Sequence, residues 1–168
     1  CLEIAAYMLQ LAGRGEKWTT LESARADAEK SLQDGSALAK FRLMVETQKG
    51  DVLMVDDPSL LPTATIQKEI VAPQSANISQ VAADDIARAA LALGAGRARK
   101  EDNVDLAVGV EVFVSVGDVV SEGDVIARIH ANNSAKVQEA QKFIEKAILY
   151  NAEKVEPLPL FYGVIDGR

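Results

Sequence analysis

The 168-residue sequence contains one cysteine, one histidine and few aromatic residues, which make up 5% of the chain. The single cysteine, Cys1, excludes an internal disulfide and a cysteine-based metal cluster, and the single histidine, His130, excludes a zinc site built from several histidines. No apolar run approaches the roughly 20 residues that cross a bilayer. No segment has the pattern of a secretory signal, so we expect a cytoplasmic location and no membrane partner.

Basic residues are also in deficit. The 25 acidic residues outnumber the 18 basic ones, which gives a net charge of −7. The electrostatic field of a negatively charged protein repels the phosphate backbone of nucleic acids, so nucleic acid is not an expected partner. The apolar 48% is mostly Ala, Val, Leu and Ile, which suits a folded protein of helices and strands. Because the chain starts without Met and directly on a helical pattern, we expect it to be a piece of a longer protein.

The first part of the chain has the apolar spacing of three helices. Short polar residues and two prolines between Asp56 and Pro62 indicate a domain boundary, and we divide the chain into 1–58 and 59–168. The predicted helix ends are Gly13 and Gly15 for the first helix, a Thr19–Glu22 capping box and Gly35 for the second, and Ser36 as cap and Gly50 as stop for the third.

The second part mixes strand and helix patterns and predicts an α+β fold. Alternation is clearest over 108–116, where only Phe113 puts an apolar side chain on the outer face. The other expected elements are strands over 65–71, 77–81 and 125–131, a helix over 83–93 stopped by Gly94, turns at Gly117-Asp118 and Gly123-Asp124, a final helix capped by Asn133 or Ser134 with Ala147 and Ile148 inward, and an extended tail over 156–168.

Several polar groups invite a chemical interpretation, and we favour structural roles for them. The glycines of Gly94-Ala95-Gly96-Arg97 follow a helix, whereas a phosphate cradle places glycines before one, so a helix end is favoured. His130 lies at a strand end and is expected to be a satisfied polar side chain. No nucleophile motif accompanies it. The acidic pairs expected in turns or at helix starts are Asp56-Asp57, Asp84-Asp85 and Glu101-Asp102.

A series of motifs resembles the C-terminal domain of the pyrimidine-nucleoside and thymidine phosphorylases, the type II nucleoside phosphorylase family. The resemblance covers nearly the whole chain, which it identifies as a C-terminal fragment. The matching motifs are Asp56-Asp57-Pro58, Leu61-Pro62-Thr63-Ala64, Leu93-Gly94-Ala95-Gly96-Arg97, Lys100-Glu101-Asp102, Asp105, Val108-Gly109, Val116 to Asp124, Ile129-His130-Ala131 and Gln138-Glu139-Ala140.

The resemblance implies that 1–58 are terminal helices of an α/β lobe and that 59–168 form a small domain with an antiparallel, hammerhead-like barrel-sandwich sheet and two helices. It implies a homodimeric parent enzyme that phosphorolyses pyrimidine nucleosides, with phosphate as co-substrate and a potassium ion outside this chain. The residues of the Gly94-Ala95-Gly96-Arg97 and Lys100-Glu101-Asp102 motifs resemble those of the family members with broad pyrimidine specificity. The family's catalytic, substrate-binding and metal residues precede Cys1, so none is assigned here.

On this basis the fragment is expected to be inactive and to act as a scaffold, with the Leu93–Asp105 loop bracing the lobe near its hinge. The alternative is a non-enzymatic interaction module, because Val116 to Ile129 also resembles the hairpin of biotinyl and lipoyl carrier domains. Carrier function requires a lysine at the hairpin tip. The nearby Lys100 and Lys136 are instead expected in a charged loop and a helix.

Overall fold

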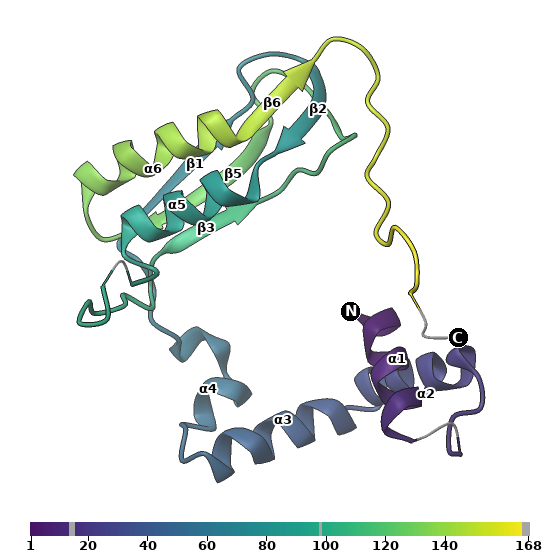
Figure 1. The fold of residues 1–168 in the computed structure, drawn as a ribbon. Coiled ribbons are helices and arrows are strands. Elements are labelled where there is room, and N and C mark those ends of the chain that lie inside the picture. The colour runs from purple at the N-terminus through teal and green to yellow at the C-terminus, as the bar shows by residue number, and fades with distance from the viewer. Residues whose placement is uncertain (14–15, 98, 166–168) are drawn as a thin grey trace. The chain divides into compact units, whose positions relative to one another are not determined.

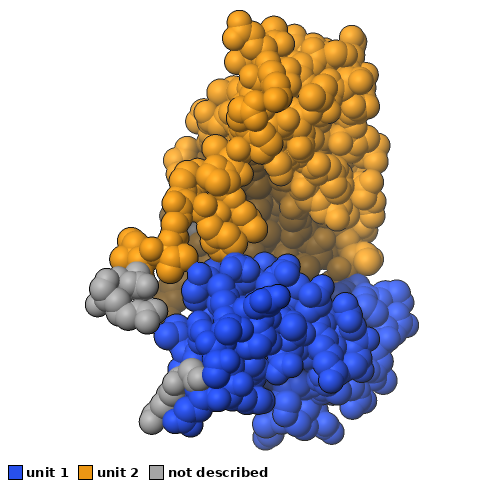
Figure 2. Space-filling model, turned by 90° about the vertical axis from the view of Figure 1, so that its right-hand side faces the viewer, with its two compact units in different colours: residues 1–61 blue, residues 62–168 orange. Residues whose placement is uncertain are grey.

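A computed structural model describes residues 1–13, 16–97 and 99–165. The predicted helix stop Gly15, residue Ala98 of the Leu93–Asp105 loop and tail residues 166–168 lie outside this described part. The chain divides into two compact units, Cys1–Leu61 and Pro62–Arg168, which Figure 2 colours separately. This division falls close to the boundary expected at 58/59. Assigning the units to an enzyme lobe and a C-terminal domain stays a prediction.

The first unit is helical. Its elements are α1 (Leu2–Ala12), α2 (Leu21–Gln33), α3 (Ser36–Thr47), α4 (Leu53–Asp56) and a 3-10 turn η1 (Pro58–Leu60). Helices α1 and α2 pack together, and each buries one alanine completely, Ala6 and Ala24. Small side chains at the contact allow the two backbones to approach closely.

Two predicted helix caps in this unit are wrong. Thr20, not Thr19, caps α2: its backbone is extended and its hydroxyl accepts a hydrogen bond from Ser23 N at 3.2 Å. Gly35, not Ser36, precedes α3, because only a residue that tolerates a φ of +78° fits the tight turn between α2 and α3. Ser36 is already helical, and its N–H donates to Asp34 Oδ1 at 2.9 Å.

The second unit contains strands and two long helices, as Figure 1 shows. Every strand pair is antiparallel, and the strands form two sheets ordered β1-β5-β3 and β4-β2-β6. The α+β class is therefore confirmed, and within the described residues neither sheet closes into a barrel. The elements are β1 (Ile66–Val71), β2 (Ala76–Val81), α5 (Ala83–Leu93), β3 (Gly109–Val112), β4 (Val119–Val120), β5 (Val125–Ala131), α6 (Ser134–Ala147) and β6 (Ile148–Asn151).

Helices α5 and α6 lie side by side over one face of the β1-β5-β3 sheet (Figure 1). Ala89 of α5 and Ala140 of α6 are both fully buried, so small side chains again allow close packing. The largest fully buried side chains are four isoleucines that join both sheets to α6: Ile78, Ile129, Ile144 and Ile148. This core fixes which face of the sheet is left to polar residues.

The strand predicted over 108–116 is shorter in the structure. β3 ends at Val112, although Phe113 N still donates to Ile126 O at 2.9 Å. Beyond it, Gly117 N donates to Ile78 O at 2.9 Å, so the chain leaves one sheet for the other. The apolar alternation continues because both sheets face the same core, but the strand partner changes.

The end of the last helix was also misplaced. Ile148 was predicted to lie inside the helix, whereas α6 ends at Ala147 and Ile148 pairs with Val81 as the first residue of β6. Ile148 is only 1% exposed, so its burial suits either a helix or a strand. The cap of α6 is Asn133, whose Oδ1 accepts from Ala135 N at 2.9 Å.

Candidate functional site

The Leu93–Asp105 loop begins at a helix end, as predicted. Gly94 stops α5 with a φ of +106°. The N–H groups of Gly94 and Ala95 donate to Leu91 O and Ala90 O, both at 3.0 Å, so they are already used within the helix end. Lys136 of α6 donates from Nζ to Leu93 O at 3.2 Å, a favourable place for a cation. This arrangement supports a helix cap and not a phosphate cradle.

The end of the same loop is held by a small polar network. Asp105 N donates to Gly94 O at 3.0 Å, which closes the loop at its base. One carboxylate oxygen of Asp105 accepts from Ala107 N at 3.0 Å, and the other accepts from Asn132 Nδ2 at 2.9 Å. Asn132 Oδ1 in turn accepts from Thr65 N at 2.9 Å and from Thr65 Oγ1 at 3.1 Å.

These contacts lower the pKa of Asp105. The main cause is the hydrogen bond from Asn132, followed by the one from Ala107 N, and Lys136 adds a favourable charge. The carboxylate is therefore charged at neutral pH and acts as an acceptor. A group in this state cannot serve as a general acid there.

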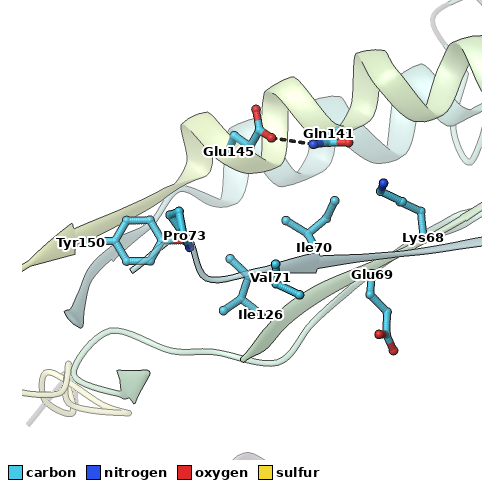
Figure 3. A pocket seen from close by; sticks show the side chains of 9 residues that line it. All are labelled: Lys68, Glu69, Ile70, Val71, Pro73, Ile126, Gln141, Glu145 and Tyr150. Atoms are coloured by element: carbon cyan, nitrogen blue, oxygen red, sulfur yellow. Dashed lines mark hydrogen bonds between the residues drawn. The ribbon is translucent and has the colours of Figure 1, made fainter. Parts of the chain in front are cut away.

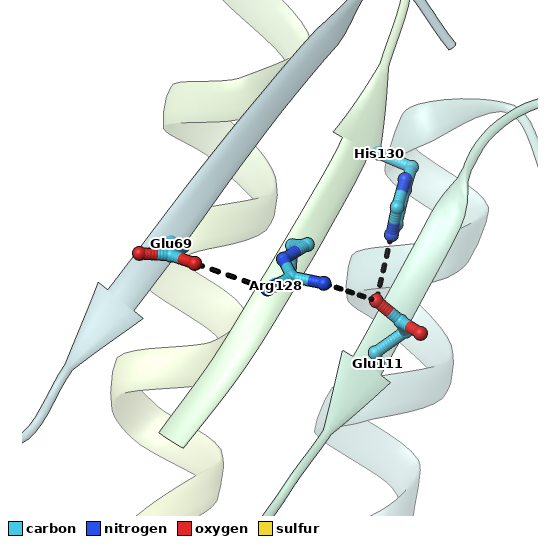
Figure 4. Close-up of polar contacts among 4 residues, drawn as sticks. All are labelled: Glu69, Glu111, Arg128 and His130. Carbon is cyan, nitrogen blue, oxygen red and sulfur yellow. Dashed lines mark hydrogen bonds and ion pairs between the residues drawn. The ribbon is translucent and has the colours of Figure 1, made fainter. Parts of the chain in front are cut away.

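A second polar cluster lies on the outer face of the β1-β5-β3 sheet, shown in Figure 4. Arg128 donates to Glu69 Oε1 at 3.0 Å and to Glu111 Oε2 at 3.4 Å, and its guanidinium lies 5.4 Å from the Phe113 ring centroid. His130 Nε2 lies 2.9 Å from the same Glu111 oxygen. The interpretation of His130 as a satisfied polar side chain is thus confirmed.

The histidine contact also changes Glu111. It is the largest cause of the lowered pKa of this carboxyl group, ahead of the charge of Arg128. These residues are placed by register, since Arg128 pairs with both Glu69 and Glu111 across the sheet. Cross-strand pairs of opposite charge stabilise a sheet modestly. Among the described residues no serine or cysteine hydrogen-bonds to these side chains, so the cluster does not have the composition of a serine or cysteine triad.

A pocket of about 400 Å³ lies between β1 and α6 (Figure 3). Apolar side chains, including the buried Ile70 and Ile126, form its floor. On its rim, Gln141 Nε2 donates to Glu145 Oε1 at 2.7 Å, so both groups are already engaged. Burial, and then the Glu145 charge, raise the pKa of Tyr150, which therefore stays protonated at neutral pH. These groups do not form a nucleophile and base pair.

At least one member of each acidic pair makes a structural contact, although Asp56 ends α4 and does not lie in a turn or at a helix start. Asp56 pairs with Arg42 at 3.0 Å, and Asp57 accepts from Ser59 N at 3.0 Å at the start of η1. Asp85, in the first turn of α5, pairs with Lys146 at 3.2 Å. In the loop, Asp102 accepts from Arg99 N at 2.8 Å.

Two classes of site find no support in the described part of the chain. No three His, Cys, Asp or Glu side chains there gather in a way that would hold a metal ion. Helices long and apolar enough to cross a membrane are likewise missing from the described residues. We place no potassium ligand in this chain.

Comparison with known proteins decides the family. Residues 77–151 match the model of the pyrimidine nucleoside phosphorylase C-terminal domain. The chain therefore carries the C-terminal domain of the pyrimidine nucleoside phosphorylase family. This match contains β2, α5, β3, β4, β5, α6 and β6, and so includes the Leu93–Asp105 loop and Asn132.

The similarity extends beyond the phosphorylase domain itself. The chain is 42% identical over 156 residues to a pyrimidine-nucleoside phosphorylase of Staphylococcus haemolyticus (strain JCSC1435), covering 93% of this chain and 35% of that protein. It is 40% identical over 166 residues to the one of Geobacillus stearothermophilus, covering 99% of this chain and 37% of the relative. The chain thus spans little more than a third of the length of these relatives.

Sequence reasoning found the loop but not its anchors. Asp105 stood out in the sequence only as part of a motif, and Asn132 was given no role. Thr65 was placed at the start of a strand. A polar residue directly after a buried strand was the available signal for Asn132, but nothing local indicates a partner 67 residues away.

Proposed function

We propose that the full-length protein containing this chain is a pyrimidine-nucleoside phosphorylase. Inorganic phosphate would attack the anomeric carbon of a pyrimidine nucleoside, releasing the free base and a pentose 1-phosphate. The observation that carries this proposal is the family match over residues 77–151, together with about 40% identity to phosphorylases along most of the chain.

Within that enzyme, we propose that this chain is a scaffold and is inactive alone. The polar groups of the second unit support this role because they bind one another: Asp105 binds Asn132, Glu111 binds His130 and Arg128, and Asp85 binds Lys146. Such pairs stabilise a fold, and none of these described pairs joins a serine, threonine or cysteine to a base. The Leu93–Asp105 loop would brace the neighbouring lobe near its hinge.

The wider properties of the parent enzyme follow from the same proposal. It would use phosphate as co-substrate, bind a potassium ion outside this chain, form a homodimer and work in the cytoplasm. Closure of its lobes would position phosphate and nucleoside and exclude water. Preference for uridine or thymidine would be set by residues outside this chain.

The test is phosphate-dependent release of free base from uridine and from thymidine by the full-length protein, with this chain assayed in parallel. We expect base release by the full-length protein only, and none when phosphate is omitted. Base release by neither would refute the phosphorylase proposal. Base release by the isolated chain would refute the scaffold role alone.

The carrier-module alternative is not favoured by any observed contact. The turns at Gly117-Asp118 and Gly123-Asp124 carry no lysine, and the Lys136 amino group is bound to Leu93 O at 3.2 Å on α6. Intact-mass measurement of protein purified from cells tests it directly. A mass increase matching a biotinyl or lipoyl group on a lysine would restore this alternative.

A further inference from the structure

Among the described residues, one side chain, Asn132, hydrogen-bonds both to the start of the second unit and to the base of the Leu93–Asp105 loop. Its carbonyl oxygen accepts from the backbone and the hydroxyl of Thr65, 67 residues earlier in the sequence. Its amide nitrogen donates to Asp105, 27 residues earlier. A side-chain amide has one acceptor end and one donor end, and here each end holds a different segment.

Each of the two segments is also held by contacts that do not involve the other. Thr65 directly precedes β1, whose pairing with β5 begins at Ile66 and Ala131. The loop base is closed by Asp105 N on Gly94 O and by Lys136 on Leu93 O. Asn132 itself follows Ala131 directly, so the end of β5 fixes its backbone. The backbone of Asn132 is therefore fixed, and only its side-chain amide can rotate to change hydrogen-bond partners.

We propose that Asn132 is a clasp, a positioning residue that couples the loop base to the segment entering the second unit. When Asp105 is in place, its carboxylate orients the Asn132 amide so that the carbonyl oxygen faces Thr65. When the loop base opens, that orientation is lost and Thr65 is released as well. The clasp goes beyond the proposed function and does not depend on phosphorolysis.

The clasp is suited to opening and closing because its side chains lie at the surface. Asn132 and Thr65 are exposed and Asp105 is half-buried, so water competes for each hydrogen bond. Individual bonds of this kind contribute little on their own. Coupling arises because one rigid amide makes both contacts, and losing one contact frees the rotation that maintains the other.

The test measures hydrogen exchange by mass spectrometry in the full-length protein, in peptides covering 62–68 and 103–109. The decisive variant is Asp105→Ala, which removes the loop-side partner of Asn132 and leaves Thr65 intact. It also removes the acceptor of Ala107 N, a contact that lies within the 103–109 peptide. The clasp predicts exchange faster by about threefold to tenfold in both peptides, the change expected from losing a hydrogen bond of ordinary strength. Faster exchange confined to 103–109 would overturn it, because the two contacts would then be independent.

A polarity swap provides a second, fold-conserving test. Asn132→Asp places a carboxylate against Asp105 and should speed exchange in both peptides. Adding Asp105→Asn restores a donor facing an acceptor, so the double variant should return to within about twofold of the parent rate. A double variant that exchanges as fast as Asn132→Asp alone would overturn the proposal. Asn103→Ala, which removes an exposed asparagine from the same loop, is the matched control and should leave 62–68 unchanged.

Discussion

Gly117 and Gly123 provide a matched pair of turn positions in which the same substitution has different consequences. Both residues have a positive φ, +96° and +90°. A Cβ added at Gly117 would lie 2.8 Å from Pro157 N and 2.9 Å from Pro157 Cα. A Cβ added at Gly123 would have no atom within 4 Å. The pair therefore separates backbone strain from contact with the C-terminal tail.

The expected magnitudes follow from these two situations. Alanine at a left-handed position costs about 1–2 kcal/mol, so Gly123→Ala should lower the free energy of unfolding by about that amount. Gly117→Ala carries the same cost plus overlap with the backbone of Pro157, which has to move. Overpacking of this kind typically adds about 1–3 kcal/mol, with the tail's own contribution to stability as the upper limit.

Urea unfolding of both variants, followed by circular dichroism, measures the two free energies. Hydrogen exchange in a peptide covering 153–160 then reports whether the tail has moved, which we expect for Gly117→Ala only. Equal losses in the two variants would refute the argument that the tail is packed against Gly117. No loss in Gly123→Ala would refute the argument from backbone strain. Gly109→Ala, without a positive φ and with open space around it, is the control for adding a methyl group.

Three further predictions follow from the second unit. Ala140→Leu should lower the free energy of unfolding by about 1–3 kcal/mol, because Ala140 is fully buried between α5 and α6, and thermal melting checks this; an unchanged melting temperature would contradict the close helix packing. The lowered pKa values of Asp105 and Glu111 stabilise the fold above the usual carboxyl range, and this stability is lost as pH falls through the folded-state values. The melting temperature should therefore fall between about pH 6 and about pH 3. The fall should be smaller in Asn132→Ala, because this variant removes the largest cause of the lowered pKa of Asp105. An equal fall in both proteins would contradict the assigned role of Asn132. Arg97→Ala in the full-length protein should reduce kcat/KM for phosphorolysis or lower the melting temperature if the loop braces the proposed lobe. Unchanged kinetics together with unchanged melting would rule the brace out.

The sequence was most informative where one face of an element is buried. Helix α5 was predicted over 83–93 and is observed over Ala83–Leu93, because its apolar residues repeat at helical spacing and Gly94 ends it. The strand predicted over 125–131 is likewise observed as β5, Val125–Ala131. Its side chains alternate between buried and half-buried from Ala127 to Ala131, whereas Ile126 and Ala127 are buried in succession. In both cases a local pattern and the tertiary environment agree.

Predictions failed where a local pattern does not define the partner. Ile148 extends the apolar stripe of α6 but pairs with Val81, and burial alone does not distinguish these environments. The apolar alternation over 108–116 continues while the chain passes from one sheet to the other, which it has reached at Gly117. The alternation shows which face is buried but not which strand is the partner. The contacts of Asn132 depend on register between distant segments, so they became visible only in three dimensions.

We propose above that the full-length protein is a pyrimidine-nucleoside phosphorylase and that this chain supports its catalysis without supplying a catalytic group. His130 is the only histidine of the sequence and binds Glu111 at 2.9 Å, so this imidazole is the group in the chain best suited to acid and base chemistry. The most direct measurement is kcat/KM for uridine phosphorolysis by the full-length protein carrying His130→Gln. We predict a value within about twofold of the parent, since general acid or base catalysis is typically worth about 100-fold or more. A loss of about 100-fold in a folded variant would contradict the claim and place His130 in the reaction.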